Sequence, residues 1–578
     1  MRFSIAVAGL AAGLAAWPAD ARSVLFVGPR DVIQHALWRA LPGDVVEVAG
    51  SHVEQVRMPS RVTLRGVRGA EVRFDRGAVI TFRDVRGARV EGFRIVRAAG
   101  AEGGENADPA VLFENADATL AGCTVQSRTG GIGVTGASTA HLLDNRVVGA
   151  EIGIVFKDVA LGYADGNAIS DSREAGVEIR GEAAPHLVDT VVSRNRVGLR
   201  YLERALGDAV GTVASDNSLC GIRVEGRAEP ALSGGRIAAN PVGVFIGDQA
   251  NVRLSGAEVR DNVVDGLVAS DSARVVATRN RFAGNGRFGA SIEGAAIVRV
   301  EAGAAESNRM AGMAVWDGAA PVFSKVTFSG NAQSGLLFAG RSRGTAIGCS
   351  ARDNGWDGIE VRGEASPSIS QCLLVGNAGS GVRFWQAASG TAKGNRAIAN
   401  RRTGLAAWDR ASVHLAENRA ERNEVAGVAF FAHASGTATG NEARRNLLAG
   451  AAIADFAAPA LTGNLLEDNG TGLLYLDRAA GEARDNTIRG NWTSGVALWG
   501  FAAPLLEANA ISENRGAGVF CVDHAAPRLA RNAISGNTLG VDVENPEHTA
   551  GSPRLAGNAI AGNLFLDYNG VRPVYPER

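Results

Sequence analysis

Apolar and polar residues alternate in short runs along most of the chain, and each run follows a glycine. With the glycine as position zero, positions +1 and +3 are apolar, as in Val428 and Phe430 after Gly427, whereas positions +2 and +4 vary and include charges. A period of two is typical of a strand with one buried face. No long stretch of the repeat region shows a convincing helical period. The pattern therefore predicts many short, half-buried strands.

The glycines that precede these strands recur at a fixed spacing. Seventeen of the eighteen intervals between them are 22 or 23 residues. We expect glycine there because it adopts a backbone φ that a β-branched residue could not adopt. The column consists of Gly133, Gly153, Gly176, Gly198, Gly221, Gly243, Gly266, Gly289, Gly312, Gly335, Gly358, Gly381, Gly404, Gly427, Gly450, Gly472, Gly495, Gly518 and Gly540.

Two columns of asparagine accompany the glycines. One precedes the glycine by three or four residues and runs from Asn195 to Asn537; the other lies five residues earlier, as in Asn395 and Asn418. In stacked turns about 4.8 Å apart, an inward amide can donate and accept along the stack and satisfy buried turn groups. A unit of 22–23 residues with short strands and no helix fits one coil of a parallel β-helix. The sequence therefore predicts an all-β, single-stranded β-helix of about 20 coils.

The N-terminal region, before the repeats, contains a predicted signal peptide and a predicted helix followed by strands. Arg2, an apolar stretch and Ala19-Asp20-Ala21 are typical of a secretory signal peptide over residues 1–21, which implies a periplasmic or secreted protein. Residues 30–41 place apolar groups at helical spacing, and Pro42-Gly43 ends that pattern. Strands are expected at residues 44–48 and 62–66.

This helix followed by strands resembles the N-terminal cap of the pectate-lyase-like superfold. The asparagine and glycine columns resemble the right-handed parallel β-helix repeat family of carbohydrate-binding proteins and sugar hydrolases. The resemblance implies a right-handed β-helix over residues 67–565, an N-terminal cap with a capping helix over 22–66 and a C-terminal tail over 566–578. The superfold hosts lyases, hydrolases, epimerases, tailspikes, copper-enzyme accessory proteins and adhesins, so the fold leaves the activity open.

Charge and cysteine content exclude several functions. The 59 basic and 60 acidic residues give a net charge of −1, which argues against nucleic-acid binding. No segment approaches the length of a membrane span. The five cysteines and eight histidines lack metal-ligand spacing, so we expect no metal and no cofactor. Cys349 and Cys372 occupy one column a coil apart, and both a disulfide and stacked thiols fit that placement.

The Asp523-His524 pair, after Val522, resembles a short signature of some pectate lyases. Asp523 lies at position +5, where Asp409 and Asp455 also occur and where other coils carry glycine. A position that exchanges Asp for Gly is typical of a turn, because both tolerate unusual backbone angles. The pattern therefore favours turn formation over catalysis at Asp523, and no catalytic residue is assigned.

Position +4 points outward and changes from polar to aromatic near residue 316. Sugar rings bind such surfaces through their apolar faces, and small residues fill position +2 beside it. Glu360, Arg362 and Arg383 lie close by, where they could pair with the carboxylate of an acidic sugar. The aromatic members of this predicted platform are Trp316, Trp385, Trp408, Phe431 and Trp499.

Two functional hypotheses follow from these features. Nearly constant coil length leaves little room for the loops that wall a catalytic cleft, which favours an exported protein that binds polysaccharide or a cell-envelope partner. The alternative is a polysaccharide-active enzyme, either a uronate lyase, an epimerase or a glycoside hydrolase. An apolar stripe of this size is also typical of an oligomer or partner interface, and cover by loop residues or the C-terminal tail of the same chain is a third alternative.

Overall fold

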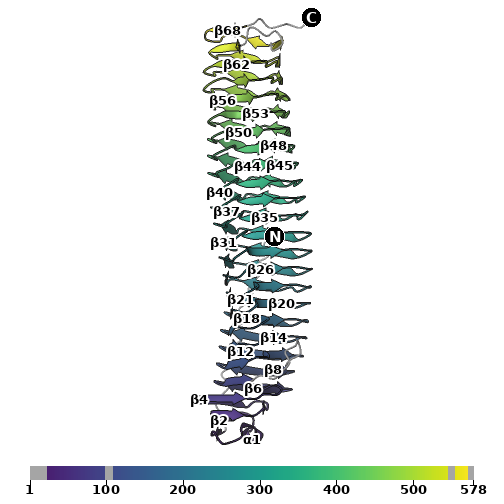
Figure 1. The fold of residues 1–578 in the computed structure, drawn as a ribbon, viewed down its shortest axis with the longest axis vertical. Helices are drawn as coiled ribbons and strands as arrows, with labels where there is room; N and C mark the ends of the chain where they lie inside the picture. The colour runs from purple at the N-terminus through teal and green to yellow at the C-terminus, as the bar shows by residue number, and fades with distance from the viewer. Residues whose placement is uncertain (1–22, 98–107, 545–552, 571–578) are drawn as a thin grey trace, which may run out of the picture. The chain divides into compact units, whose positions relative to one another are not determined.

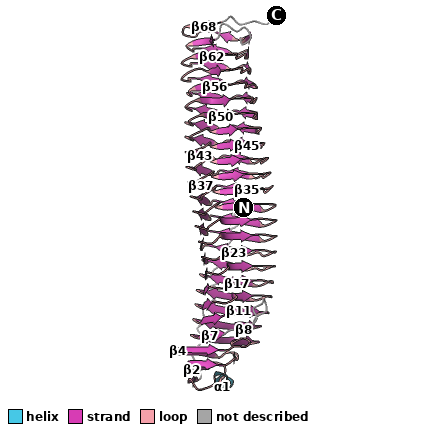
Figure 2. Ribbon diagram, in the orientation of Figure 1, coloured by secondary structure: helices cyan, strands magenta, loops and turns pink. Residues whose placement is uncertain are grey.

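The computed structural model describes residues 23–97, 108–544 and 553–570. The chain divides into two compact units, residues 1–173 and 174–578. Each unit consists of coils that stack through parallel strand pairs, and the strands dominate the secondary structure (Figures 1 and 2). The fold is an all-β right-handed parallel β-solenoid with about 23 coils, slightly more than the number expected from the repeats. The predicted fold class is confirmed.

The first unit begins with β1 (Val24–Val27), α1 (Ile33–Arg39), β2 (Val45–Val53) and β4 (Thr63–Arg73). β1 pairs in parallel with β2, and β2 with β4. The helix and both strands lie where the sequence predicted them, although the helix is shorter. Its capping role remains a prediction, and the predicted signal peptide lies outside the described residues.

A coil of the second unit contains three strands, for example β44 (Val382–Phe384), β45 (Ser389–Lys393) and β46 (Arg396–Ile398). Each strand pairs with its equivalent in the coils before and after it, so three ladders run through the unit. We call the ladder that follows the glycine column the first ladder. Its strands from Met313 onward are β35 (Met313–Val315), β38 (Leu336–Phe338), β41 (Ile359–Val361), β44, β47 (Leu405–Ala407), β50 (Ala426–Phe430), β53 (Ala449–Ile453), β56 (Thr471–Tyr475), β59 (Val496–Leu498), β62 (Ala517–Val522), β65 (Leu539–Glu544) and β68 (Leu566–Asn569).

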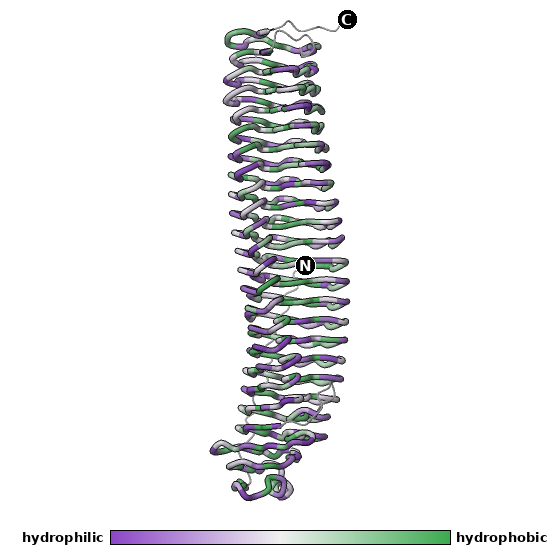
Figure 3. The backbone as a smooth tube through the Cα atoms, in the orientation of Figure 1, coloured by the Kyte–Doolittle hydropathy of each residue, from purple (hydrophilic) through white to green (hydrophobic). Residues whose placement is uncertain are grey.

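The core lies inside the coils and is filled by positions +1 and +3 of the first ladder together with one residue from each strand of the other two. Val428 and Phe430 are 3% and 0% exposed. Coloured by hydropathy, the coils show hydrophobic and hydrophilic residues interspersed along each strand (Figure 3). The predicted alternation of buried and exposed positions is confirmed.

The asparagine columns form hydrogen-bonded ladders at two corners of the coils. The backbone N–H and the Nδ2 of Asn423 both donate to Oδ1 of Asn446, at 3.0 and 2.9 Å. Nδ2 also donates to the carbonyl oxygen of Ala397, at 3.1 Å. Asn423 in turn accepts from both donors of Asn400. Each amide thus satisfies buried groups of two coils, as predicted.

The reason expected for the glycine column is wrong. None of these glycines has a positive φ in the described structure. Glycine is needed there because neighbouring coils approach too closely for a side chain. A Cβ on Gly404 would lie 2.5 Å from the carbonyl oxygen of Gly427, 2.7 Å from Cβ of Ala420 and 3.1 Å from Nδ2 of Asn423.

The first member of the column is also corrected. In the first unit, Gly131 takes the place assigned to Gly133, because Gly133 pairs with Val155. A Cβ on Gly131 would clash with the carbonyl oxygen of Gly153. The spacing from Gly131 to Gly153 is 22 residues, which removes the one irregular interval.

We expect Gly404→Ala to lower the free energy of unfolding by about 3 kcal/mol, because the Cβ would press on a backbone oxygen that cannot move without shifting the next coil. Gly463→Ala is the matched control. Gly463 has a φ of +63° but open space around its Cβ position, so alanine there should cost only about 1 kcal/mol. Thermal unfolding of both variants measures the difference. An equal or larger loss for Gly463→Ala would show that φ, rather than close approach, governs glycine usage.

The Asp and Gly residues at position +5 are turn residues, as predicted. Asp523 has a φ of +60° and Gly500, one coil earlier, a φ of +70°. The Asp523 carboxylate accepts a hydrogen bond from the backbone N–H of Gly500, at 3.2 Å. Asp455 does the same for Ala432, at 2.9 Å. These carboxylates therefore join consecutive turns.

All five cysteines are buried and unbonded. Burial raises the pKa of the Cys123 thiol to about 11 and those of Cys220 and Cys521 to about 12. A hydrogen bond that the Cys372 thiol donates to Cys349, together with burial, raises the pKa of Cys372. The structure therefore has stacked thiols where the sequence left a disulfide open.

The described residues contain no group of three or more His, Cys, Asp or Glu side chains that could hold a metal ion. Within the same residues, none of the helical segments has the length and apolar character that crossing a membrane requires.

Candidate functional site

The outward face of the first ladder carries the predicted platform. Trp316, Trp385, Trp408 and Phe431 are half-buried at position +4, and Trp499 is 43% exposed. The small residues at position +2 lie beneath them and are themselves covered, forming an apolar cluster with neighbouring residues of their ladder. Its buried members are Ala406, Ala426, Ala429, Ala449, Ala452, Leu474 and Ala497.

The rings of the platform are tilted rather than coplanar. Trp408 and Phe431 lie 4.4 Å apart, ring centre to ring centre, at an angle of 43°. Trp499 meets Phe520 edge to face at 6.0 Å. Because Trp408 and Phe431 also pack on the alanine cluster, each presents only part of its ring to solvent. The platform is thus a ridge of tilted rings above a floor of small side chains.

Glu360, on β41, is 2% exposed and organises the polar part of the face. Its carboxylate accepts hydrogen bonds from the Ser334 hydroxyl, at 2.7 Å, and from the Trp385 indole N–H, at 3.1 Å. Arg362 and Arg383 approach the same carboxylate at 3.7 and 3.8 Å. Glu360 is therefore buried beneath the surface, where it orients Trp385 and two guanidinium groups.

A second buried carboxylate, Asp357, lies just before β41 and is also 2% exposed. It accepts a hydrogen bond from the backbone N–H of Ser380 at 2.7 Å, and the Arg383 guanidinium lies 2.8 Å away. Burial raises the pKa of the Asp357 carboxyl to about 6, against the opposing effect of Arg383. The carboxyl therefore titrates near neutral pH.

These side chains line an open cavity of about 380 Å³. Arg402, just before β47, completes its charged lining. The site therefore has three guanidinium groups and, with Glu360 beneath the surface, two carboxyl groups. Its net charge is +1 when Asp357 is ionised and +2 when Asp357 is protonated. The residues that line the cavity are Gly355, Trp356, Asp357, Arg362, Ala378, Gly379, Arg383, Trp385 and Arg402.

Two cation–π contacts join the arginines to the platform. The Arg383 guanidinium lies 5.1 Å from the centre of the Trp385 ring, and that of Arg362 lies 5.7 Å from the Trp316 ring. Arg362 thus reaches over Ala339, in the coil between, to Trp316. The structure brings Trp316, Glu360, Arg362, Arg383 and Trp385 into one site, whereas Trp408 and Phe431 extend it along the ladder and Trp499 lies further along.

Sequence reasoning missed Asp357 and Arg402. They lie one and two residues before their column glycines, Gly358 and Gly404, at positions that were not compared between coils. An acid at position −1 does recur at Asp265, which is 1% exposed and forms an ion pair with Arg287. Comparison of positions −1 and −2 would have found both residues.

Two family models match the sequence. Residues 207–332 and 315–464 match a model described as "Right handed beta helix region". Residues 414–574 match "Periplasmic copper-binding protein (NosD)". No curated protein matched the chain.

Several solved structures resemble the fold. The Dettilon tailspike protein is 12% identical, with a TM-score of 0.40, and the match covers 55% of this chain and 69% of that one. The periplasmic alginate epimerase AlgG, as a double mutant, is 12% identical, with a TM-score of 0.26 and coverages of 61% and 83%. The A-module of the Azotobacter vinelandii mannuronan C-5 epimerase AlgE6 is 11% identical, with a TM-score of 0.22 and coverages of 70% and 90%.

The coil-on-coil parallel ladders, the asparagine columns and the family-model matches agree with one another. Residues 207–464 resemble the right-handed β-helix repeat family, and the fold of the described residues is a right-handed parallel β-helix.

Proposed function

We propose that this protein is exported and binds an acidic polysaccharide at the cavity around Trp385. The observation that carries the proposal is the surplus of guanidinium groups beside a half-buried indole. Guanidinium groups pair with carboxylates in a planar, often bidentate geometry. Arg362, Arg383 and Arg402 are placed to receive a sugar carboxylate, while the Trp385 ring offers an apolar face to the sugar.

Export is part of the proposal. Residues 1–21 have the pattern of a secretory signal, and the second matching family model is described as periplasmic. Both support a periplasmic or secreted location, where polysaccharide is available as a ligand.

The matching model's description also names copper, and the residues of this chain do not fit that metal. Residues 414–574 contain no methionine, and their one cysteine, Cys521, is buried with a pKa raised to about 12. Cu(I) prefers soft sulfur ligands, and thiols bind metals as thiolates. None of the described histidines of this range, His414, His433 and His524, belongs to a group of three or more His, Cys, Asp or Glu side chains that could hold a metal ion. We therefore assign no copper site to the described part of this region.

The raised pKa of Asp357 predicts that binding is tighter below pH 6 than above it. Above that pH, ionised Asp357 competes with the ligand for Arg383, whereas below it the neutral carboxyl leaves Arg383 available; Glu360 and Arg402 are the other charges close to Asp357. We expect oligouronate to bind wild-type protein about tenfold more tightly at pH 5 than at pH 7.5, equivalent to about 1.4 kcal/mol. Calorimetric titration at the two pH values measures this.

Asp357→Asn provides the comparison, because it is neutral throughout. It should bind with the tight affinity at both pH values. The pKa of Asp357 is higher in the folded than in the unfolded state, so the wild-type free energy of unfolding should fall as the pH rises from about 4 to about 6. The variant should lack this loss. A wild-type affinity independent of pH would contradict the role given to Asp357.

A second candidate function is favoured by the same carboxyl. A buried acid with a pKa near 6, in a cavity with arginines, has the properties of a general acid or base. An enzyme of this kind would act as a uronate lyase, an epimerase or a hydrolase. Incubation with a panel of uronate polymers, read by ultraviolet absorbance of unsaturated products and by release of reducing ends, tests cleavage. Product formation that Asp357→Asn abolishes would favour this candidate over binding alone.

A further inference from the structure

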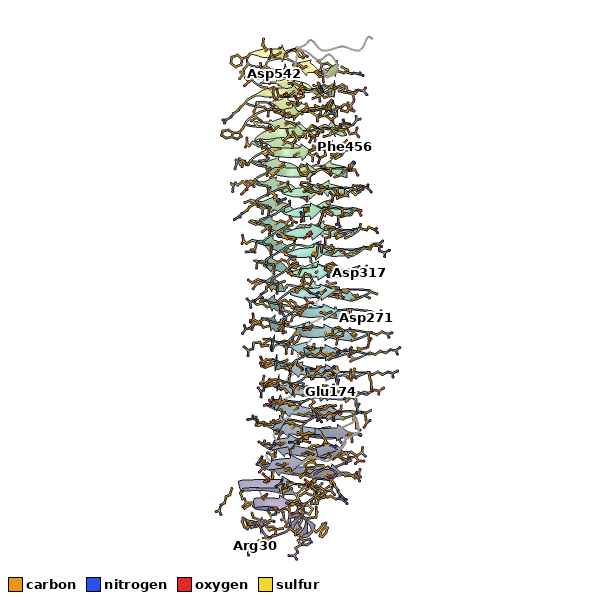
Figure 4. The ribbon with its side chains drawn as sticks, viewed as in Figure 1. Arg30, Glu174, Asp271, Asp317, Phe456 and Asp542 are labelled. Atoms are coloured by element: carbon orange, nitrogen blue, oxygen red, sulfur yellow. The ribbon has the colours of Figure 1, made fainter. Side chains whose placement is uncertain are left out.

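Position +6 of the first ladder, in the turn after each strand, carries a row of aromatic and cationic side chains. The row occupies five consecutive coils, and sequence reasoning did not consider it. Phe456 and Phe501 are 54% and 55% exposed, so both rings present much of their surface to solvent. Phe456 lies along the same side of the second unit as the turn residues Asp271 and Asp317 (Figure 4). We call this row the turn ladder: His433, Phe456, Arg478, Phe501 and His524.

The members of the turn ladder contact one another in order. The His433 and Phe456 rings stack at 5.1 Å with an angle of 10°, and Phe501 and His524 lie 4.9 Å apart. Between them, the Arg478 guanidinium lies 6.0 Å from the Phe456 ring and 5.5 Å from the Phe501 ring. A continuous column of π faces and one cation therefore runs along the stacking direction.

Arg478 is the charged centre of this row. It is exposed, and no carboxylate of the described residues lies within ion-pair distance of its guanidinium. Asp477, the residue before Arg478, forms no ion pair with it among the described residues, and Asp455, the turn acid of the preceding coil, is engaged with the backbone N–H of Ala432. An unpaired guanidinium between two exposed rings complements a ligand that presents apolar faces at intervals and an anion between them.

The turn ladder continues the platform. Phe431, which contacts Trp408, is followed two residues later by His433, and Leu476 and Trp499 accompany the turn ladder at position +4. From Trp385 to Phe501 the surface spans five coil spacings, about 24 Å at about 4.8 Å each. Phe456 and Phe501 are two spacings apart, about 10 Å, which suits alternate rings of a sugar chain.

We propose that the turn ladder is a second ligand-contact surface, on which an acidic polysaccharide lies along the stacking direction with sugar rings on Phe456 and Phe501 and a carboxylate on Arg478. The inference takes the class of ligand from the proposed function. It adds that the ligand is a long chain, held at the cavity and at the turn ladder together.

The test compares a uronate disaccharide with an oligouronate longer than about 24 Å, titrated calorimetrically into the full chain. Two sites on one chain raise the affinity, so wild-type protein should bind the long oligomer at least about tenfold more tightly than the disaccharide. The double variant Arg478→Gln, Phe501→Ala should lose that gain and bind the disaccharide unchanged. Arg227→Gln is the matched control, because Arg227 occupies position +6 after Gly221 and contacts Gln249 rather than a ring.

The outcomes separate the two proposals. If the disaccharide fails to bind while long-oligomer binding depends on Arg478 and Phe501, the cavity site fails and the turn ladder stands. If the double variant binds the long oligomer as tightly as wild type, or if no oligouronate binds, the turn ladder is not a sugar surface. Sedimentation of the same proteins tests whether a second copy of the chain binds the turn ladder instead of a sugar. Self-association that the double variant abolishes, without a change in sugar affinity, would overturn the proposal.

Discussion

Replacing Trp385 and Trp408 together with alanine is expected to abolish retention of the protein on an alginate or pectate affinity matrix. Trp385 is held in place by its hydrogen bond to Glu360 and by Arg383 over its ring, so truncation removes both a sugar-stacking face and an ordered neighbour of the arginines. Trp408 extends that surface towards Phe431. Aromatic residues at binding hot spots contribute about 2 kcal/mol or more each, so the double loss corresponds to about a thousandfold weaker binding.

Trp38→Ala is the matched control for this experiment. Trp38 lies in α1 of the first unit and is 73% exposed, so its loss removes an indole without touching the site. The melting temperature of each variant shows whether the coils remain folded. Retention of the folded double variant at the wild-type salt concentration would contradict the platform.

Asn423→Leu is expected to lower the free energy of unfolding by about 1–3 kcal/mol. The leucine side chain cannot donate to Asn446 or Ala397, and it leaves both donors of Asn400 without their acceptor. Buried polar groups deprived of their partners carry a desolvation cost of that size. The loss should appear as a lower melting temperature in circular dichroism.

Asn251→Leu is the corresponding control. Asn251 is half-buried on β27 (Asn251–Ser255), and its side chain reaches a solvent-accessible carboxylate, Glu229. Water can replace that contact, so the melting temperature should change little. An unaltered melting temperature in Asn423→Leu itself would show that the asparagine ladder does not stabilise the coils.

The sequence was sufficient to predict the coils because each repeat reports the same local requirements. Alternation at positions +1 to +4 shows which side chains face the core of the coil and which face solvent. An asparagine such as Asn423 recurs because every corner has the same backbone groups that need a hydrogen-bond partner. The reason for glycine at a position such as Gly404 was predicted wrongly, because a single repeat does not reveal it. Its constraint is the distance to the next coil, and a sequence gives no measure of how closely two coils approach.

The site was only partly predictable for a related reason. Trp385 could be found because position +4 changes from polar to aromatic near residue 316, and Arg383 because it lies beside Trp385 at position +2. Asp357 and Arg402 come from different coils and occupy positions before the glycine, where burial and pairing depend on neighbours one coil away. The burial of Glu360 was equally invisible, because its position in an outward column implied exposure. The contacts of Arg478 with two rings likewise exist only when coils are stacked.

The most direct test of the account is a calorimetric titration of the full chain with two forms of one oligouronate, the native acid and a form whose carboxylates have been reduced to neutral alcohols. If guanidinium groups in the cavity receive sugar carboxylates, the acidic form should bind at least about tenfold more tightly, and added salt should weaken that preference. Equal affinity for the two forms, or no binding of the acidic one, would contradict the account.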